Sequence, residues 1–149
     1  MLRNAAVLAA LALASTHALG ASCEATVDGT DLMTYSVQSL DVSRGCERFT
    51  LHLTHTGTMP KTVMGHNWVL TTADDQPGVA EDGAQAGAEH DYLKPGDARV
   101  IAHTRLIGGG EADSTTFELS RLDPAQRYVF FCTYPGHQVL MKGTVALVP

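Results

Sequence analysis

The stretch Tyr128–Met141, YVFFCTYPGHQVLM, holds a thiol, an imidazole and a thioether within ten positions, as Cys132, His137 and Met141. Its first four residues are aromatic, β-branched and uncharged, which predicts a buried strand that ends at the cysteine. The following Thr133–Gly136 predicts a tight turn, because Pro presets its own φ and Gly accepts a positive one. The strand and the turn therefore bring one strong sulfur ligand, one nitrogen ligand and one weak sulfur ligand to the same place.

This donor set indicates a copper site. Thiolate and thioether are soft ligands that suit copper, whereas magnesium and calcium prefer oxygen. A mononuclear site of this type needs a second imidazole, which His66 in the segment Met64–Trp68 (MGHNW) can supply. A buried cysteine is also common as a plain core thiol, and methionine is an ordinary filler of core gaps. The spacing of Cys132, His137 and Met141 favours the ligand interpretation.

Five segments resemble those of the azurins, a family of bacterial blue copper proteins, and occur in the same order. They are VMGHNWVL (63–70), DYLKPGD (91–97), RVIAHTRLIG (99–108), FFCTYPGH (130–137) and LMKGT (140–144). Four residues separate the cysteine from the histidine and three separate the histidine from the methionine, whereas plastocyanin and amicyanin have a shorter first loop. The resemblance implies an all-β, cupredoxin-like Greek-key sandwich or barrel with a short helical flap between its middle strands.

The resemblance also implies one copper ion in a type 1 (blue) site. His66, Cys132 and His137 would form a trigonal plane around it, which matches a two-histidine, one-cysteine site with weak axial ligands. The axial contacts would come from Met141 on one side and the Gly65 carbonyl on the other. Glycine at this position would let the backbone approach the metal closely.

Two further groups of residues are implied around the ligands. The backbone N–H groups of Asn67 and Tyr134 would donate hydrogen bonds to the Cys132 sulfur, and Asn67 would tie the two ligand loops together. Tyr134 stands where azurins often have Phe. An apolar patch around the edge of His137 would dock redox partners, since adaptable methionines suit transient contacts. Its members would be Met33, Met59, Pro60, Met64 and Pro135.

The N-terminal residues 1–20 predict a secretory signal peptide, followed by one domain at 21–149. Arg3 gives a positive start, Ala5–Ala14 is an apolar core, and Ala18–Gly20 places small residues at a cleavage position. Without residues 1–20 the chain has 129 residues and a formal charge of −7. An acidic chain without basic clusters is a poor nucleic-acid binder. We expect export to the periplasm and no stable association with the membrane.

Three cysteines leave one unpaired in an oxidising compartment. Cys23 and Cys46 lie in the early region and Cys132 lies between histidine-bearing segments, so a Cys23–Cys46 disulfide is expected, and the resemblance implies the same pair. The competing interpretation is that Cys23 is a lipoprotein acylation site. Gly20 disfavours it, because a larger apolar residue is expected three positions before the acylated cysteine.

Most of the remaining chain predicts short strands separated by turns, which is typical of a sandwich. Arg99–Ile107 reads as an alternating strand, and Val27–Gly29 reads as a turn. Ala73–Glu89 shows no alternation and predicts a loop with a short, imperfect helix. Its three glycines, Gly78, Gly83 and Gly87, disfavour a long helix. Trp68 is expected in the core.

Together these features predict a monomeric carrier of single electrons rather than an enzyme, since occupied axial positions leave no open place for a substrate. The resemblance implies c-type cytochromes, copper nitrite reductase or amine dehydrogenase as partners.

Copper delivery is an alternative, although the chain lacks an exposed Met or His cluster. A structural domain with zinc or no metal is another. His55 is expected beside the site but not on the metal.

Overall fold

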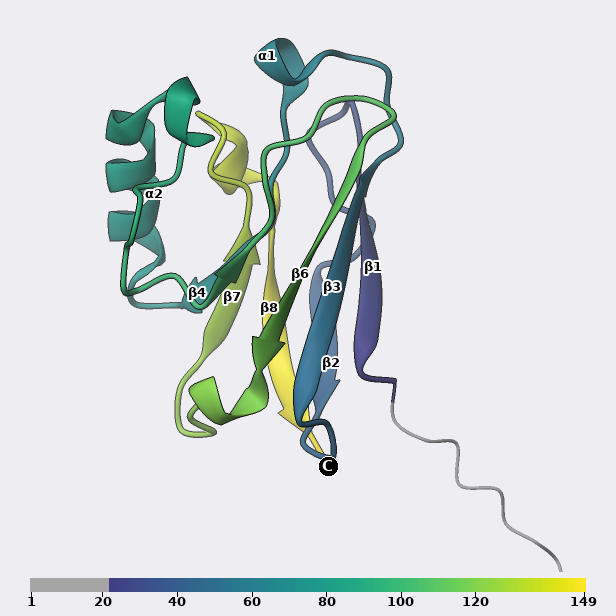
Figure 1. Ribbon diagram of the computed structural model, residues 1–149, viewed down its shortest axis with the longest axis vertical. Helices are drawn as coiled ribbons and strands as arrows, with labels where there is room; N and C mark the ends of the chain where they lie inside the picture. Colours follow the sequence, from purple (N-terminus) through teal and green to yellow (C-terminus); the bar gives the residue numbers. More distant parts are fainter. Residues whose placement is uncertain (1–21) are drawn as a thin grey trace, which may run out of the picture.

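The computed structural model describes residues 22–149 as a sandwich of two β-sheets (Figure 1). The expected signal peptide at 1–20 lies outside the described residues. In chain order the elements are β1 (Glu24–Gly29), β2 (Ser39–Ser43), β3 (Arg48–His55), α1 (Lys61–Met64), β4 (Val69–Thr72), α2 (Gln76–Ala86), η1 (Ala88–His90), β5 (Ala102–His103), β6 (Ala112–Glu118), η2 (Leu119–Arg121), β7 (Tyr128–Phe131), η3 (His137–Val139) and β8 (Lys142–Val148). Within this part of the chain, no helix is long and apolar enough to cross a membrane.

The two sheets have the strand orders β1-β3-β6 and β2-β8-β7-β4-β5. The pairs β1·β3 and β2·β8 are parallel, and the other pairs are antiparallel. Because consecutive strands β1 and β2 lie in different sheets, the chain crosses the sandwich at its start. The predicted all-β, cupredoxin-like sandwich with a helical flap is confirmed.

The core lies between the sheets and includes the fully buried Trp68, as predicted. Phe49, Leu51 and Leu53 of β3 are buried in strict alternation with partly exposed neighbours. The Trp68 ring, directly before β4, stacks on Phe130 of the neighbouring strand β7, with ring centroids 5.7 Å apart. Burying side chains of this size contributes about 1.5–3 kcal/mol each. The core therefore fixes the ends of β3 and β7, from which two of the site's segments emerge.

Two of the sequence predictions are wrong. Val27–Gly29 is the end of strand β1 and not a turn, since Val27 is buried in the core and the strand pairs with β3 as far as Gly29 and His55. The predicted strand Arg99–Ile107 shrinks to the two residues of β5. On either side of β5, side-chain hydrogen bonds take the place of regular strand pairing. The Thr71 hydroxyl donates to the Arg99 carbonyl, and the Thr104 hydroxyl accepts from the Trp68 amide.

The flap holds one short helix, the 11-residue α2, within the predicted segment Ala73–Glu89. Gly83 is needed for packing, because a side chain there would collide with the backbone carbonyl of Tyr92. Val79 packs with Val69 and Phe131 on the outer face of the five-stranded sheet. Figure 1 shows α2 standing outside the sandwich beside β4 and β7. The flap explains why both faces of β4 and β7 are buried.

The predicted Cys23–Cys46 disulfide is confirmed, with Cα atoms 5.7 Å apart. Cys23 precedes β1 and Cys46 precedes β3, and these two strands run parallel. The Cys23 carbonyl also accepts a hydrogen bond from the Thr50 amide. The crosslink therefore sets the start of both strands, whose far ends reach the metal-binding end of the sandwich.

Replacing both cysteines, Cys23→Ser with Cys46→Ser, should lower the free energy of unfolding by about 3 kcal/mol, because the unfolded chain regains the entropy of an open loop. Urea unfolding of the metal-free protein measures this loss. A loss below about 1 kcal/mol would mean that the disulfide adds little beyond strand pairing.

Candidate metal centre

Cys132 lies directly after strand β7, where the sheet holds its backbone. The Cys132 amide donates to the Met141 carbonyl at 3.0 Å, and the Met141 amide donates to the His137 carbonyl at 2.7 Å. Between them, Gly136 takes a left-handed conformation (φ 84°) that favours glycine. The strand and the turn therefore fold into the closed loop that the sequence predicts, with all three sulfur and nitrogen side chains buried.

His66 reaches the same place from a different part of the chain. Its backbone exchanges two hydrogen bonds with Ile107, at 2.9 and 2.8 Å. Its Nε2 lies 2.9 Å from the Thr30 carbonyl, so Nε2 carries the proton and Nδ1 keeps its lone pair. The ring packs on the backbone of Gly29, where a Cβ would lie only 2.6 Å from the His66 Cδ2. Any larger residue at position 29 would push the imidazole away.

The donor atoms of His66, Cys132 and His137 all lie within 4.8 Å of one another. Within residues 22–149 they are the only such group of three metal-binding side chains. The Cys132 Sγ is 3.7 Å from the His137 Nδ1. The His66 Nδ1 is buried and has no hydrogen-bond partner among the described residues. A buried polar atom without a partner is costly, so the site fits a ligand that accepts this lone pair.

Burial keeps all three groups uncharged in the metal-free protein. It raises the pKa of the Cys132 thiol to about 12, although hydrogen bonds from the backbone amides of Asn67 and Tyr134 act in the opposite direction. Burial also lowers the pKa of His66, and lowers that of His137 to about 4 with help from the neighbouring imidazoles. At neutral pH both histidines therefore offer lone pairs. A bound cation would be needed to stabilise the thiolate.

Asn67 connects the two segments that carry the ligands. Its side-chain oxygen accepts from the Thr133 amide at 2.9 Å, and its side-chain nitrogen donates to the Thr133 hydroxyl at 2.7 Å. The same nitrogen donates to the Asp91 carbonyl at 3.2 Å. The Tyr35 hydroxyl donates to the Asn67 carbonyl from inside the core. Loop-to-loop hydrogen bonds that the resemblance implies for Asn67 are thus present, and Thr133 is their partner.

His55 lies beside the centre and cannot bind the metal in this conformation. Its ring stacks on His66, with centroids 4.4 Å apart and planes 10° apart. The Gly57 amide donates to its Nδ1, and its Nε2 donates to the Met64 carbonyl. Both ring nitrogens are therefore engaged, and His55 acts as a support that holds the His66 ring flat against Gly29.

Met141 and the Gly65 carbonyl are the implied axial groups. Met141 is fully buried at the end of the loop. The Gly65 carbonyl lies 3.8 Å from the Cys132 Sγ. A Cβ at Gly65 would lie 2.5 Å from the Lys61 carbonyl, so only glycine allows α1 to end so tightly. The buried Met141 and the Gly65 carbonyl beside the thiol are compatible with the weak contacts that the resemblance implies.

The surface at this end of the sandwich is more apolar than the sequence indicated. Met59, Pro60 and Pro135 are exposed, whereas Met33 and Met64 are only partly so. Four residues that sequence reasoning missed are more exposed than any methionine here, namely Leu32, Val63, Val139 and Leu140. They lie in the β1–β2 connection, in α1 and in and after η3, which meet at one end of the molecule (Figure 1). The adjacent Val139 and Leu140 in a short ligand loop were the available signal.

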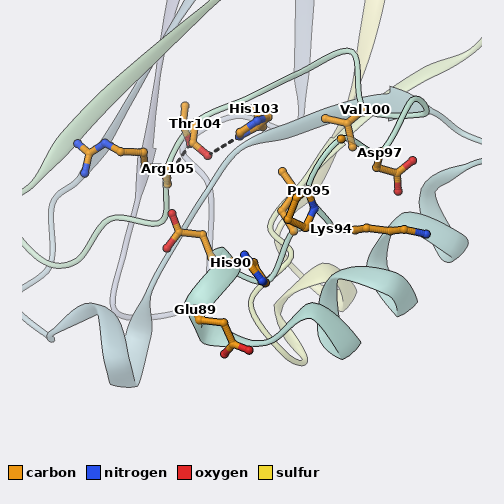
Figure 2. Close-up of a pocket in the computed structure, with 12 residues that line it drawn as sticks. Glu89, His90, Lys94, Pro95, Asp97, Val100, His103, Thr104 and Arg105 are labelled. Atoms are coloured by element: carbon orange, nitrogen blue, oxygen red, sulfur yellow. Dashed lines mark hydrogen bonds between the residues drawn. The ribbon is translucent and has the colours of Figure 1, made fainter.

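A separate pocket of about 420 Å³ opens between η1 and β5 and does not include the triad. Figure 2 shows His90 and His103 on its wall, with His103 turned toward Thr104. Each is exposed, and neither belongs to a group of three metal-binding side chains in the described chain. This pocket is therefore not a second metal centre of the same type.

Comparison with known proteins decides the family. The sequence profile described as copper binding proteins, plastocyanin/azurin family, matches residues 21–148. The chain belongs to the plastocyanin/azurin family. The azurins of Pseudomonas aeruginosa and Achromobacter denitrificans are each 51% identical over 147 residues, 99% of both chains in each comparison. A solved structure of the azurin Az-iso2 from Methylomonas sp. strain J is 50% identical, with a TM-score of 0.83, and covers 87% of this chain and 100% of that one.

Membership of the plastocyanin/azurin family gives the buried triad its chemistry. The protein is a blue copper protein that transfers electrons, with one copper ion as its cofactor. Soft sulfur and imidazole donors suit copper in both of its common oxidation states better than they suit hard cations. The unpartnered His66 nitrogen and the buried thiol are the features of this chain that fit the family's metal.

The metal-free protein should lose stability as the pH falls from about 6.5 to about 4. The pKa of His137 is near 6.5 when unfolded and about 4 when folded, so the unfolded chain binds more protons in this window. The loss could reach about 3 kcal/mol. Urea unfolding at several pH values, compared with His137→Gln, isolates this contribution. Equal pH slopes for the two proteins would contradict it.

Proposed function

We propose that His66, Cys132 and His137 would hold the copper ion directly, and that Met141 and the Gly65 carbonyl would contact it more weakly. The observation that carries this assignment is the buried His66 Nδ1, which has no hydrogen-bond partner within residues 22–149, on a ring grouped with the thiol and the second imidazole. When bound, copper supplies a centre that can accept and release one electron. Asn67 and Tyr134 act on the sulfur through their backbone amides, which stabilise its thiolate form.

The protein's own contribution to electron transfer is to hold the donors still. His66 is fixed by Ile107, Thr30 and the ring of His55, and Cys132 by the sheet and by Asn67. If the donors cannot move, little energy is needed to rearrange them when the charge changes. These five contacts would leave no open position for a substrate. We therefore propose a carrier without enzymatic activity.

We further propose that the carrier works in the periplasm, after removal of residues 1–20, as a domain of residues 21–149. The hydrophobic N-terminal run and the disulfide support this location, because disulfides persist in oxidising compartments. Its partners would be c-type cytochromes, copper nitrite reductase or amine dehydrogenase. They would dock on the apolar end around His137, the ligand that lies nearest the surface of the three.

Addition of one equivalent of Cu(II) to the metal-free protein should produce an intense visible absorption that ascorbate bleaches and reoxidation restores. The short bond between copper and a thiolate is its source, so Cys132→Ser should abolish it. His103→Gln removes an exposed imidazole outside the triad and should keep it. Equal absorption in wild-type protein and in Cys132→Ser would show that the sulfur is not a ligand.

Electron exchange with a c-type cytochrome should slow by about tenfold or more in Leu140→Lys, because docking would bury a charge in an apolar contact. Leu140 is 60% exposed, so the fold should tolerate the change. Ala125→Lys adds the same charge at an exposed position in the turn before β7 and is the matched control. Stopped-flow mixing measures the rates, and the visible spectrum checks that the site is intact. Equal slowing by both variants would indicate a net-charge effect in place of docking at this end.

A further inference from the structure

The hydroxyl of Tyr134 makes a contact that no phenylalanine could make. It donates a hydrogen bond to the Thr62 carbonyl at 2.9 Å, 72 positions away in the sequence. Thr62 lies in α1, which has only four residues and ends at Met64. The last carbonyls of a helix lack partners within it. The amide that would bond to Thr62 in a longer helix, that of His66, bonds to Ile107 instead. Tyr134 therefore caps the C-terminal end of α1.

We propose that the Tyr134 hydroxyl is an outer clamp that holds the two ligand-bearing segments of the metal centre at a fixed separation. On one side, Tyr134 is two residues after Cys132, and its ring packs on His137 with centroids 4.6 Å apart. On the other side, α1 runs directly into Gly65 and His66. Within residues 22–149, this is the only side-chain hydrogen bond between the segment Cys132–Met141 and α1.

The clamp is separate from the hydrogen bonds of Asn67. Asn67 joins the two segments in the buried interior, through Thr133. Tyr134 is only partly buried and joins them near the surface, on the side where partners would dock. The Asn67 contact does not itself reach α1, which has no buried residue of its own. His55 restrains α1 from inside through the Met64 carbonyl, and Tyr134 restrains it from outside.

A second aromatic residue supports the position of Tyr134. The Tyr92 ring meets it edge-on, with centroids 5.1 Å apart and planes 68° apart. Asp91 and Tyr92 both have left-handed backbones, with φ of 54° and 53°, a conformation that non-glycine residues adopt at a cost. This turn directs the Tyr92 ring at Tyr134 and the Asp91 carbonyl at the side chain of Asn67. The same turn therefore supports both the Tyr134 clamp and the hydrogen bonds of Asn67.

Tyr134 is accordingly a positioning residue, which acts on the ligands through α1 and through its own loop. Its hydroxyl should limit outward movement of Gly65 and His66 relative to Cys132. The clamp itself is a property of the metal-free chain. Its influence on the copper centre rests on the proposed function, because it requires His66 and Cys132 to be ligands of one ion.

The test compares Tyr134→Phe with Tyr92→Phe. Each variant removes one hydroxyl from the same aromatic pair, but within the described residues the Tyr92 hydroxyl has no hydrogen bond. In the metal-free protein, amide hydrogen exchange of Val63–His66 should become about fivefold faster in Tyr134→Phe, the change expected from one ordinary hydrogen bond. It should stay unchanged in Tyr92→Phe. Unchanged exchange in Tyr134→Phe, or an equal increase in both variants, would overturn the clamp.

The copper-loaded proteins give the second readout. Tyr134→Phe should shift the reduction potential and the electron paramagnetic resonance spectrum relative to wild-type protein, and Tyr92→Phe should not shift them. Faster exchange with an unchanged potential and spectrum would overturn the positioning role and leave the hydroxyl as a plain helix cap. If wild-type protein formed no blue centre while exchange still rose in Tyr134→Phe, the ligand assignment would fail and the clamp would stand.

Discussion

The structure depends on one electrostatic constraint, which is the burial of three uncharged donors that face each other. Removing Cys132, His66 and His137 from water disfavours every charged form of these groups, so the thiol keeps its proton and the imidazoles stay neutral. A buried lone pair without a partner is unfavourable, and the chain could relieve it by letting the side chains turn away. The surrounding contacts prevent this relief, and the site is thereby preorganised for a soft cation.

Preorganisation comes from elements that have little to do with metal chemistry. The disulfide fixes the start of β1 and β3. At the far end of β1, Gly29 provides the surface on which the His66 ring packs. At the far end of β3, His55 stacks on the His66 ring. The aromatic core around Trp68 fixes β7, and β7 delivers the thiol. The flap then covers the outer face of β4 and β7, so the strands that lead to the ligands are packed on both sides. A rigid sandwich thus places donors from distant segments with the accuracy that the site requires.

The sequence predicts those features of the site that depend on residues close together in the chain. It does not predict features that depend on contacts with the backbone of distant segments. Spacing alone links Cys132, His137 and Met141, whereas His66 could be assigned only through a resemblance. Val27–Gly29 has the composition of a turn, yet parallel pairing with β3 extends it, because tertiary contacts override weak local preferences. Gly83 reads as a helix breaker, but its missing side chain makes room for the Tyr92 backbone. The Thr30 carbonyl that orients His66 has no signal in the sequence, since every residue has a carbonyl.

Under the proposed function, the same geometry would set where electrons enter. Cys132 and His66 are completely buried, whereas His137 retains 3% exposure beneath a surface with exposed Val139 and Leu140. Those apolar side chains lie in the short loop with only three residues between His137 and Met141. An exposed apolar end would favour self-association, but the acidic charge of the chain opposes close approach of identical molecules. Under the proposed docking at this end, a partner with an apolar contact surface and a basic rim would meet no such repulsion, and the apolar residues of the short loop would form its contact surface.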